Sequence, residues 1–168
     1  MDQTYLHLLI SHLPIFGSIL GGLVLANALW TKTNQTKIAA YYLLIISSIG
    51  AGVSYLTGES AEETIENLQG ASKSIIEQHE DFALYALIGF IILGLSSIVG
   101  LFVTLNNSSL TRAVAIFTLI LSLISFGLVA RTGYLGGQIR HSEIRSDVNG
   151  QINNLNESND QKSEKTND

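Results

Sequence analysis

The chain has 168 residues, of which 46% are hydrophobic and only 14% are charged, and its mean hydropathy is +0.32. A soluble domain carries roughly 25% charged residues, so this composition favours a lipid environment. The absence of cysteine excludes disulfides, thiolate-ligated iron–sulfur clusters and thioether-attached haem. The net charge of −5 arises from local acidic stretches and gives no indication of nucleic-acid binding.

Four apolar segments are each long enough to cross a bilayer as a helix, which takes about 20 residues. They extend over approximately residues 5–30, 38–56, 82–105 and 113–130. None of them alternates with the period of two that is typical of a barrel strand, so helices are the only spanning option. The sequence therefore predicts an all-α fold, an integral membrane up-down four-helix bundle.

Polar stretches separate these segments and end the chain. Two are short, at residues 31–37 and 106–109, and a long acidic connection at residues 59–81 joins the second segment to the third. Residues 1–145 form the expected membrane domain. Residues 146–168 are rich in Asn, Ser, Asp and Lys, and we expect a disordered tail because such a composition cannot bury a core. No internal repeat is evident.

The first segment has features of a retained helix. It lacks a basic leader and a small-residue cleavage site, which a signal peptide would have. Pro14 has no backbone donor and frees the carbonyl of Ile10, which allows a kink. Gly17 and Gly21 are four residues apart and permit close approach of a neighbouring helix.

All four histidines lie at one end of the expected bundle, on the same face of the membrane. With an even number of spans, the start of segment one, both ends of the long connection and the end of segment four share that face. Ionisable residues at such positions are functional candidates because they are costly in hydrocarbon. The four are His7, His12, His79 and His141.

The depth and direction of these residues differ. At about 1.5 Å per residue, His12 lies roughly 9 Å from the midplane and His7 lies at the interface. His7 and His12 are about 140° apart around a regular helix, so we do not expect them to chelate one ion. Their partners are then on other helices, and a kink at Pro14 would alter the angle.

Haem b suits this set, because neutral imidazoles are good axial ligands of haem iron. Basic side chains near the same face are candidate partners of the haem propionates. They are Arg131, Arg140 and Arg145. The plainer interpretation is that the histidines are interfacial residues hydrogen-bonded to loops.

A non-haem site for iron, copper or zinc is the rival hypothesis, because acidic residues surround the same face. The candidate ligands beside the histidines are Glu59, Glu62 and Glu80, with Glu63, Glu66, Glu77 and Glu143 nearby. Such a dense acidic connection is more often a solvated helix face. Glu77-x-His79-Glu80 does not match a zinc-protease motif, which needs a second histidine at helical spacing.

A structural or assembly subunit of a membrane complex, or a homo-oligomer, is a third class, with the acidic connection as a docking surface. Hydrolase chemistry has no support, because the sequence contains no Gly-x-Ser-x-Gly motif, phosphate loop or dinucleotide fingerprint. Whether the chain is an enzyme is therefore open, and an electron-transfer or complex subunit is favoured over a stand-alone enzyme.

The opening His7-x4-His12-x-Pro14 resembles that of a family of uncharacterised bacterial four-helix membrane domains related to b-type cytochrome membrane domains. Three further stretches are similar to those of related bacterial proteins: 57–59, 79–80 and 136–141. The resemblance implies haem ligation by His7, His12, His79 and His141, in an open pairing. It also implies the bacterial inner membrane and, without an attached c-type domain, a separate redox protein or a quinol as electron partner. The basic residues do not decide orientation, and we expect the histidine face to be non-cytoplasmic.

Overall fold

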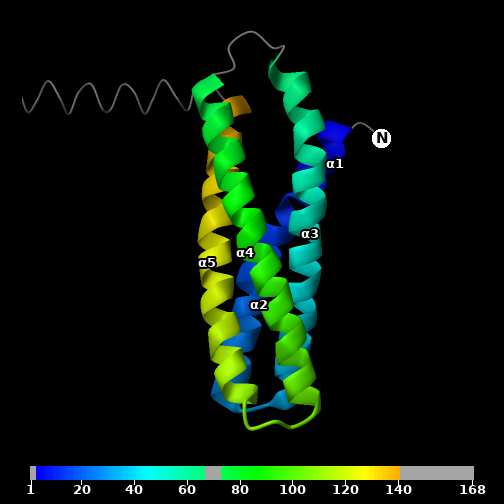
Figure 1. Cartoon of the computed structure of the whole chain (residues 1–168), viewed down its shortest axis with the longest axis vertical. Coiled ribbons are helices and arrows are strands. Elements are labelled where there is room, and N and C mark those ends of the chain that lie inside the picture. The colour runs from blue at the N-terminus through cyan, green and yellow to red at the C-terminus, as the bar shows by residue number, and fades with distance from the viewer. Residues whose placement is uncertain (1–2, 67–72, 141–168) are drawn as a thin grey trace, which may run out of the picture.

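The structure, a computed structural model, describes residues 3–66 and 73–140. Its helices form an elongated bundle in which neighbouring long helices run in opposite directions (Figure 1). The helices are α1 (Gln3–Ile10), α2 (His12–Thr31), α3 (Asn34–Glu66), α4 (Lys73–Leu105) and α5 (Thr111–Arg140). Four stretches are long and apolar enough to cross a membrane: His7–Thr31, Asn34–Gly58, Lys73–Leu105 and Thr111–Gln138. The prediction of an all-helical chain with four such helices is confirmed.

The first predicted helix is interrupted at Ser11, which separates α1 from α2. Because Pro14 has no N–H, the carbonyl of Ile10 loses its donor four residues on, as the sequence suggested. The backbone N–H of Ser11 still donates to the carbonyl of His7 at 2.9 Å. On the N-terminal side of this break, α1 packs against α3, so the start of the chain lies on the bundle.

The helices extend further into the polar segments than the sequence indicated. Much of the acidic connection is helical, because α3 continues to Glu66 and α4 begins at Lys73. Glutamate, alanine, lysine and glutamine have high helix propensity, so the helices continue past their apolar parts. Similarly, α5 ends at Arg140, ten residues beyond its apolar segment. His141 and the tail at 146–168 lie outside the described residues.

The interior is built from small residues that let the helices approach closely. A methyl group built at Gly17 would lie 2.7 Å from Cβ of Ser47, and one at Gly21 would lie 2.6 Å from Cδ2 of Leu44. The close approach expected at Gly17 and Gly21 is therefore present, between α2 and α3. Phe90 is fully buried in the same core.

The two halves of the chain share a pattern of buried positions, which is an internal relation that the sequence analysis did not find. A shift of 72 in residue number converts every buried residue of α2 into a buried residue of α4. The α2 set is Pro14, Ser18, Gly21, Gly22, Leu25 and Ala28, and the α4 set is Ala86, Phe90, Leu93, Gly94, Ser97 and Gly100. Few residue types are shared, so burial and not identity relates the halves.

The buried positions of α3 and α5, the second long helix of each half, are also related by a constant shift in residue number. A shift of 78 matches five buried residues of α3 to five of α5. These are Lys37, Ala40, Leu44, Ser47 and Ala51 in α3, and Ala115, Thr118, Ser122, Ser125 and Val129 in α5. In addition, α2 and α4 each pack on both α3 and α5. The bundle is thus two helical hairpins with an approximate twofold relation.

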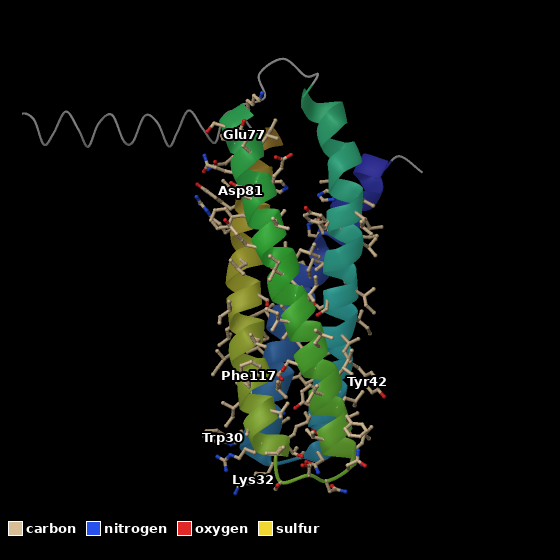
Figure 2. The ribbon with its side chains drawn as sticks, in the orientation of Figure 1. Trp30, Lys32, Tyr42, Glu77, Asp81 and Phe117 are labelled. Atoms are coloured by element: carbon tan, nitrogen blue, oxygen red, sulfur yellow. The ribbon has the colours of Figure 1, made fainter. Side chains whose placement is uncertain are left out.

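The two ends of the bundle differ. One end carries the short turns, where Lys37 Nζ donates to Asn34 Oδ1 at 3.0 Å and Asn34 Nδ2 donates to Asn107 Oδ1 at 3.2 Å. Figure 2 places Trp30 and Lys32 near that end and Glu77 and Asp81 near the opposite end. Between the ends, large apolar side chains cover the outside.

Candidate ligand-binding site

His7 is held by α3 at the end of the bundle opposite the short turns. Its Nδ1–H donates to the carbonyl oxygen of Ser54 at 2.8 Å. A carbonyl only accepts, so this bond places the proton on Nδ1 and the lone pair of the neutral ring on Nε2. The Cε1 edge of the ring lies against Gly58, where an added methyl group would be 3.4 Å away.

His79 is held by α5 in the same manner. Its Nδ1–H donates to the carbonyl oxygen of Thr132 at 3.0 Å, which again leaves the lone pair on Nε2. Its Cε1 edge lies against Gly136, where an added methyl group would be 3.2 Å away. In both cases the carbonyl comes from one residue and the glycine is four residues later, one helical turn along the same face.

The two histidines are counterparts in the approximate twofold arrangement. The shift of 72 takes His7 to His79, and the shift of 78 takes Ser54 and Gly58 to Thr132 and Gly136. Both imidazoles lie at the end of the bundle opposite the short turns. No hydrogen bond joins either Nε2 to another residue within the described ranges. The fold therefore places two imidazoles with matching tautomers, one from each half, at the same end of the bundle.

His12 is not part of this pair. It is exposed on the surface of α2, and its Nδ1–H donates to the carbonyl oxygen of Leu8 at 2.7 Å. Its ring stacks on Phe16, with ring centres 6.3 Å apart and an angle of 16° between the planes. Of the four predicted histidines, the structure thus groups His7 with His79, sets His12 apart, and does not describe His141.

The predicted propionate partners lie on α5 or beyond it. Arg131 is exposed, and its guanidinium lies 5.6 Å from the ring centre of Phe82 and 5.4 Å from that of Tyr134. It directly precedes Thr132, which holds His79. Arg140 is the last residue of α5, and its side chain is not described. Arg145 lies beyond the described residues.

The predicted carboxylate ligands are not gathered around the histidines in what the structure describes. Glu80 is exposed, next to His79 in the sequence. Glu59 and Glu62 continue α3, but their side chains are not described. Among the described residues, no group of three or more His, Asp or Glu side chains is placed to hold a metal ion.

The anchoring groups of the two histidines were not predicted as a site, although a signal was present. Both halves contain a histidine followed ten and fifteen residues later by glycine: His7 with Gly17 and Gly22, then His79 with Gly89 and Gly94. Both second helices contain a serine or threonine followed four residues later by glycine. The same residue types at the same spacings are the signal of the repeat, although most of the buried positions change residue type between the halves.

No family model, no curated protein and no solved structure matches this chain.

Proposed function

We propose that this protein spans a membrane four times and binds haem b between His7 and His79, as an electron-transfer component. Four helices of sufficient length and apolar character support the spanning arrangement. The exposed side chains between the two ends are largely apolar, among them Phe102, Leu95 and Ile49. Lipid is a favourable solvent for such a surface, whereas water is not.

The observation that carries the haem proposal is the matched pair of imidazoles. A histidine that ligates a metal almost always donates its other ring N–H to a carbonyl, carboxylate or water, which fixes the tautomer and makes the ligand nitrogen more basic. His7 and His79 both have this arrangement, with Ser54 and Thr132 as acceptors. Two neutral imidazoles, one from each half, would hold a haem iron through their Nε2 atoms.

The donor set favours haem over a non-haem metal. A zinc site needs at least three protein ligands, and a non-haem iron site commonly uses two histidines and a carboxylate. The described residues offer two imidazoles and no third ligand beside them. A porphyrin supplies the four remaining nitrogen ligands itself, so two histidines complete the coordination.

Other residues of the chain have supporting roles in this proposal. Gly58 and Gly136 leave space for the imidazole edges beside them. Arg131 and Arg140 are candidate partners for the propionates, since both belong to the same end of α5. When bound, the haem supplies one-electron redox chemistry, and the chain sets its position and surroundings. We place the protein in the bacterial inner membrane with this end outside the cytoplasm.

The test is an oxidised-minus-reduced optical spectrum of detergent-purified protein produced with ample haem. We expect a Soret band and a sharp alpha band in the wild type and in His12→Leu. We expect both bands to be lost in His7→Ala and in His79→Ala. Added imidazole should restore part of the spectrum in His79→Gly, because the free ligand can occupy the vacated position.

A featureless wild-type spectrum would rule the haem proposal out, and elemental analysis would then test for another metal. With neither haem nor metal bound, a scaffold role in a membrane complex would remain. Retention of both bands in His7→Ala and His79→Ala would remove these two residues from the site. Circular dichroism of each variant controls for loss of fold.

A further inference from the structure

His12 is the histidine that the haem site leaves without a role. Its Nδ1 proton is committed to the carbonyl of Leu8, so Nε2 has an unused lone pair and acts as a hydrogen-bond acceptor. The ring is exposed and stacked on Phe16. An acceptor of this kind is costly in hydrocarbon unless a donor reaches it.

The twofold relation pairs His12 with an exposed apolar residue. The counterpart of His12 in the second half is Leu84, which is 43% exposed. The neighbours of His12 on the same outer surface are apolar and exposed: Leu9, Leu13 and Phe16. The imidazole of His12 is therefore a departure from the repeat, and the packing of the bundle does not require it.

The depth of His12 limits which donor can reach it. His12 begins α2, five residues beyond His7 along the first spanning stretch, so in the proposed arrangement it lies deeper in the bilayer than His7. Lipid headgroups carry their N–H and O–H donors at the interface and not at this depth. A donor must then be brought by a lipid-soluble molecule with a hydroxyl group, and the stacked His12–Phe16 surface suits one with a planar ring.

We propose that the exposed His12–Phe16 surface binds a membrane-soluble hydroquinone, whose hydroxyl group donates a hydrogen bond to Nε2 of His12. The proposal rests on the electron-transfer function proposed above in its choice of ligand class, since a hydroquinone is a lipid-soluble electron donor. The binding step itself needs only the residues of α1 and α2, and it can be measured with or without haem.

The test uses full-length protein in detergent micelles with nitrogen-15-labelled histidine, because the nitrogen resonances of an imidazole report hydrogen bonding at each ring atom. Loss of signals in His12→Leu identifies those of His12. We expect this variant to fold, because leucine is the residue at the equivalent position of the second half, Leu84. A short-tailed hydroquinone should shift the Nε2 signal of His12 in a saturable way. Its dimethyl ether and the oxidised quinone, which have no hydroxyl donor, should leave that signal unchanged.

In calorimetric titrations, we expect His12→Leu, or use of the dimethyl ether, to weaken binding by about tenfold, as expected for one lost hydrogen bond in an apolar setting. Equal binding of the hydroquinone and its dimethyl ether would overturn the proposal, because the site would then recognise only an apolar ring. The proposal would also be overturned if the Nε2 signal of His12 showed a hydrogen bond before the hydroquinone is added and did not move afterwards. Water or a lipid would then be the donor. Neither result depends on the haem spectrum, so failure here is distinct from failure of the haem site.

Discussion

The imidazole of His79 lies directly against Gly136, one helical turn beyond the residue whose carbonyl accepts its Nδ1 proton. The same relation holds between His7 and Gly58. In each case the glycine supplies space for the ring edge, and the carbonyl fixes its rotation. A methyl group at Gly136 would push the ring of His79 away from its carbonyl, and the proposed ligand nitrogen would move with it, whereas a methyl group at Gly58 would make an ordinary contact with His7.

This relation predicts that Gly136→Ala weakens haem binding. The new methyl group would lie 3.2 Å from Cε1 of His79, closer than an ordinary contact, so the ring must shift by a few tenths of an ångström. Loss of such support commonly lowers metal affinity by about 10–100-fold, and we expect the lower end of that range. The measurement is a haem titration followed by Soret absorbance.

Gly137→Ala is the matched control, because the space beside Gly137 is open and the neighbouring position is otherwise equivalent. It should bind haem as the wild type does. Equal haem affinity in the two variants would show that the position of the His79 ring does not matter for binding.

A second prediction concerns the stability of the bundle at Gly100. A methyl group there would overlap the ring of Tyr41, which is fully buried between α3 and α4 and has little room to move. Overpacking of this kind destabilises by about 1–3 kcal/mol. Gly100→Ala should therefore lower the free energy of unfolding by that amount in detergent, measured by denaturant titration with circular dichroism.

Gly52→Ala provides the comparison, because a methyl group at this α3 position has nothing within 4 Å. Alanine is the better helix former, so this variant should be unchanged or more stable by about 0.5–1 kcal/mol. If both variants were equally stable, the close approach of α4 to Tyr41 would not be a feature of the folded protein.

A third prediction concerns the contact between Gly22 of α2 and Ser122 of α5. A methyl group at Gly22 would lie 2.5 Å from Oγ of Ser122, so Gly22→Ala should destabilise by about 1–3 kcal/mol. The hydroxyl of Ser122 is buried and forms no hydrogen bond within the described part of the chain, so Ser122→Ala should change stability little.

Together the two substitutions should be less damaging than their sum, because removal of Oγ makes room for the new methyl group. The expected coupling is about 1–2 kcal/mol in a double-mutant cycle of unfolding free energies. Strict additivity would contradict direct packing of α2 on α5 at this point.

Much of the fold could be predicted from the sequence, because the lengths of the apolar segments determine how many helices can cross a bilayer. The break before Pro14 was also predictable, since a missing donor acts locally. The twofold relation was not, because burial repeats between the halves while residue types change: Ser18 corresponds to Phe90 and Ala28 to Gly100.

The sequence indicated candidate ligands but not their grouping. Residue type alone singled out the histidines as candidates, and helix direction placed them at one end. Which of them share an environment depends on the direction of α1 before the break at Ser11 and on two backbone carbonyls. A carbonyl acceptor has no signature in a sequence, so the separation of His12 from His7 and His79 required the structure.

The last prediction tests the spanning arrangement itself, for which the lack of native cysteine is an advantage. Single cysteines can be placed at exposed positions at each end: Gln35→Cys and Ser109→Cys near the short turns, and Glu77→Cys near the histidine pair. If the bundle crosses the bilayer, a membrane-impermeant maleimide added to sealed inner-membrane vesicles must label Glu77→Cys or the other two, but not both groups. Detergent should then expose the protected group.

Labelling of all three sites from one side would mean that the helices lie on the membrane or fold back within it, and the depth assigned to His12 would fail with it. Labelling of only Gln35→Cys and Ser109→Cys from the cytoplasmic side would place the histidine pair outside the cytoplasm, as proposed.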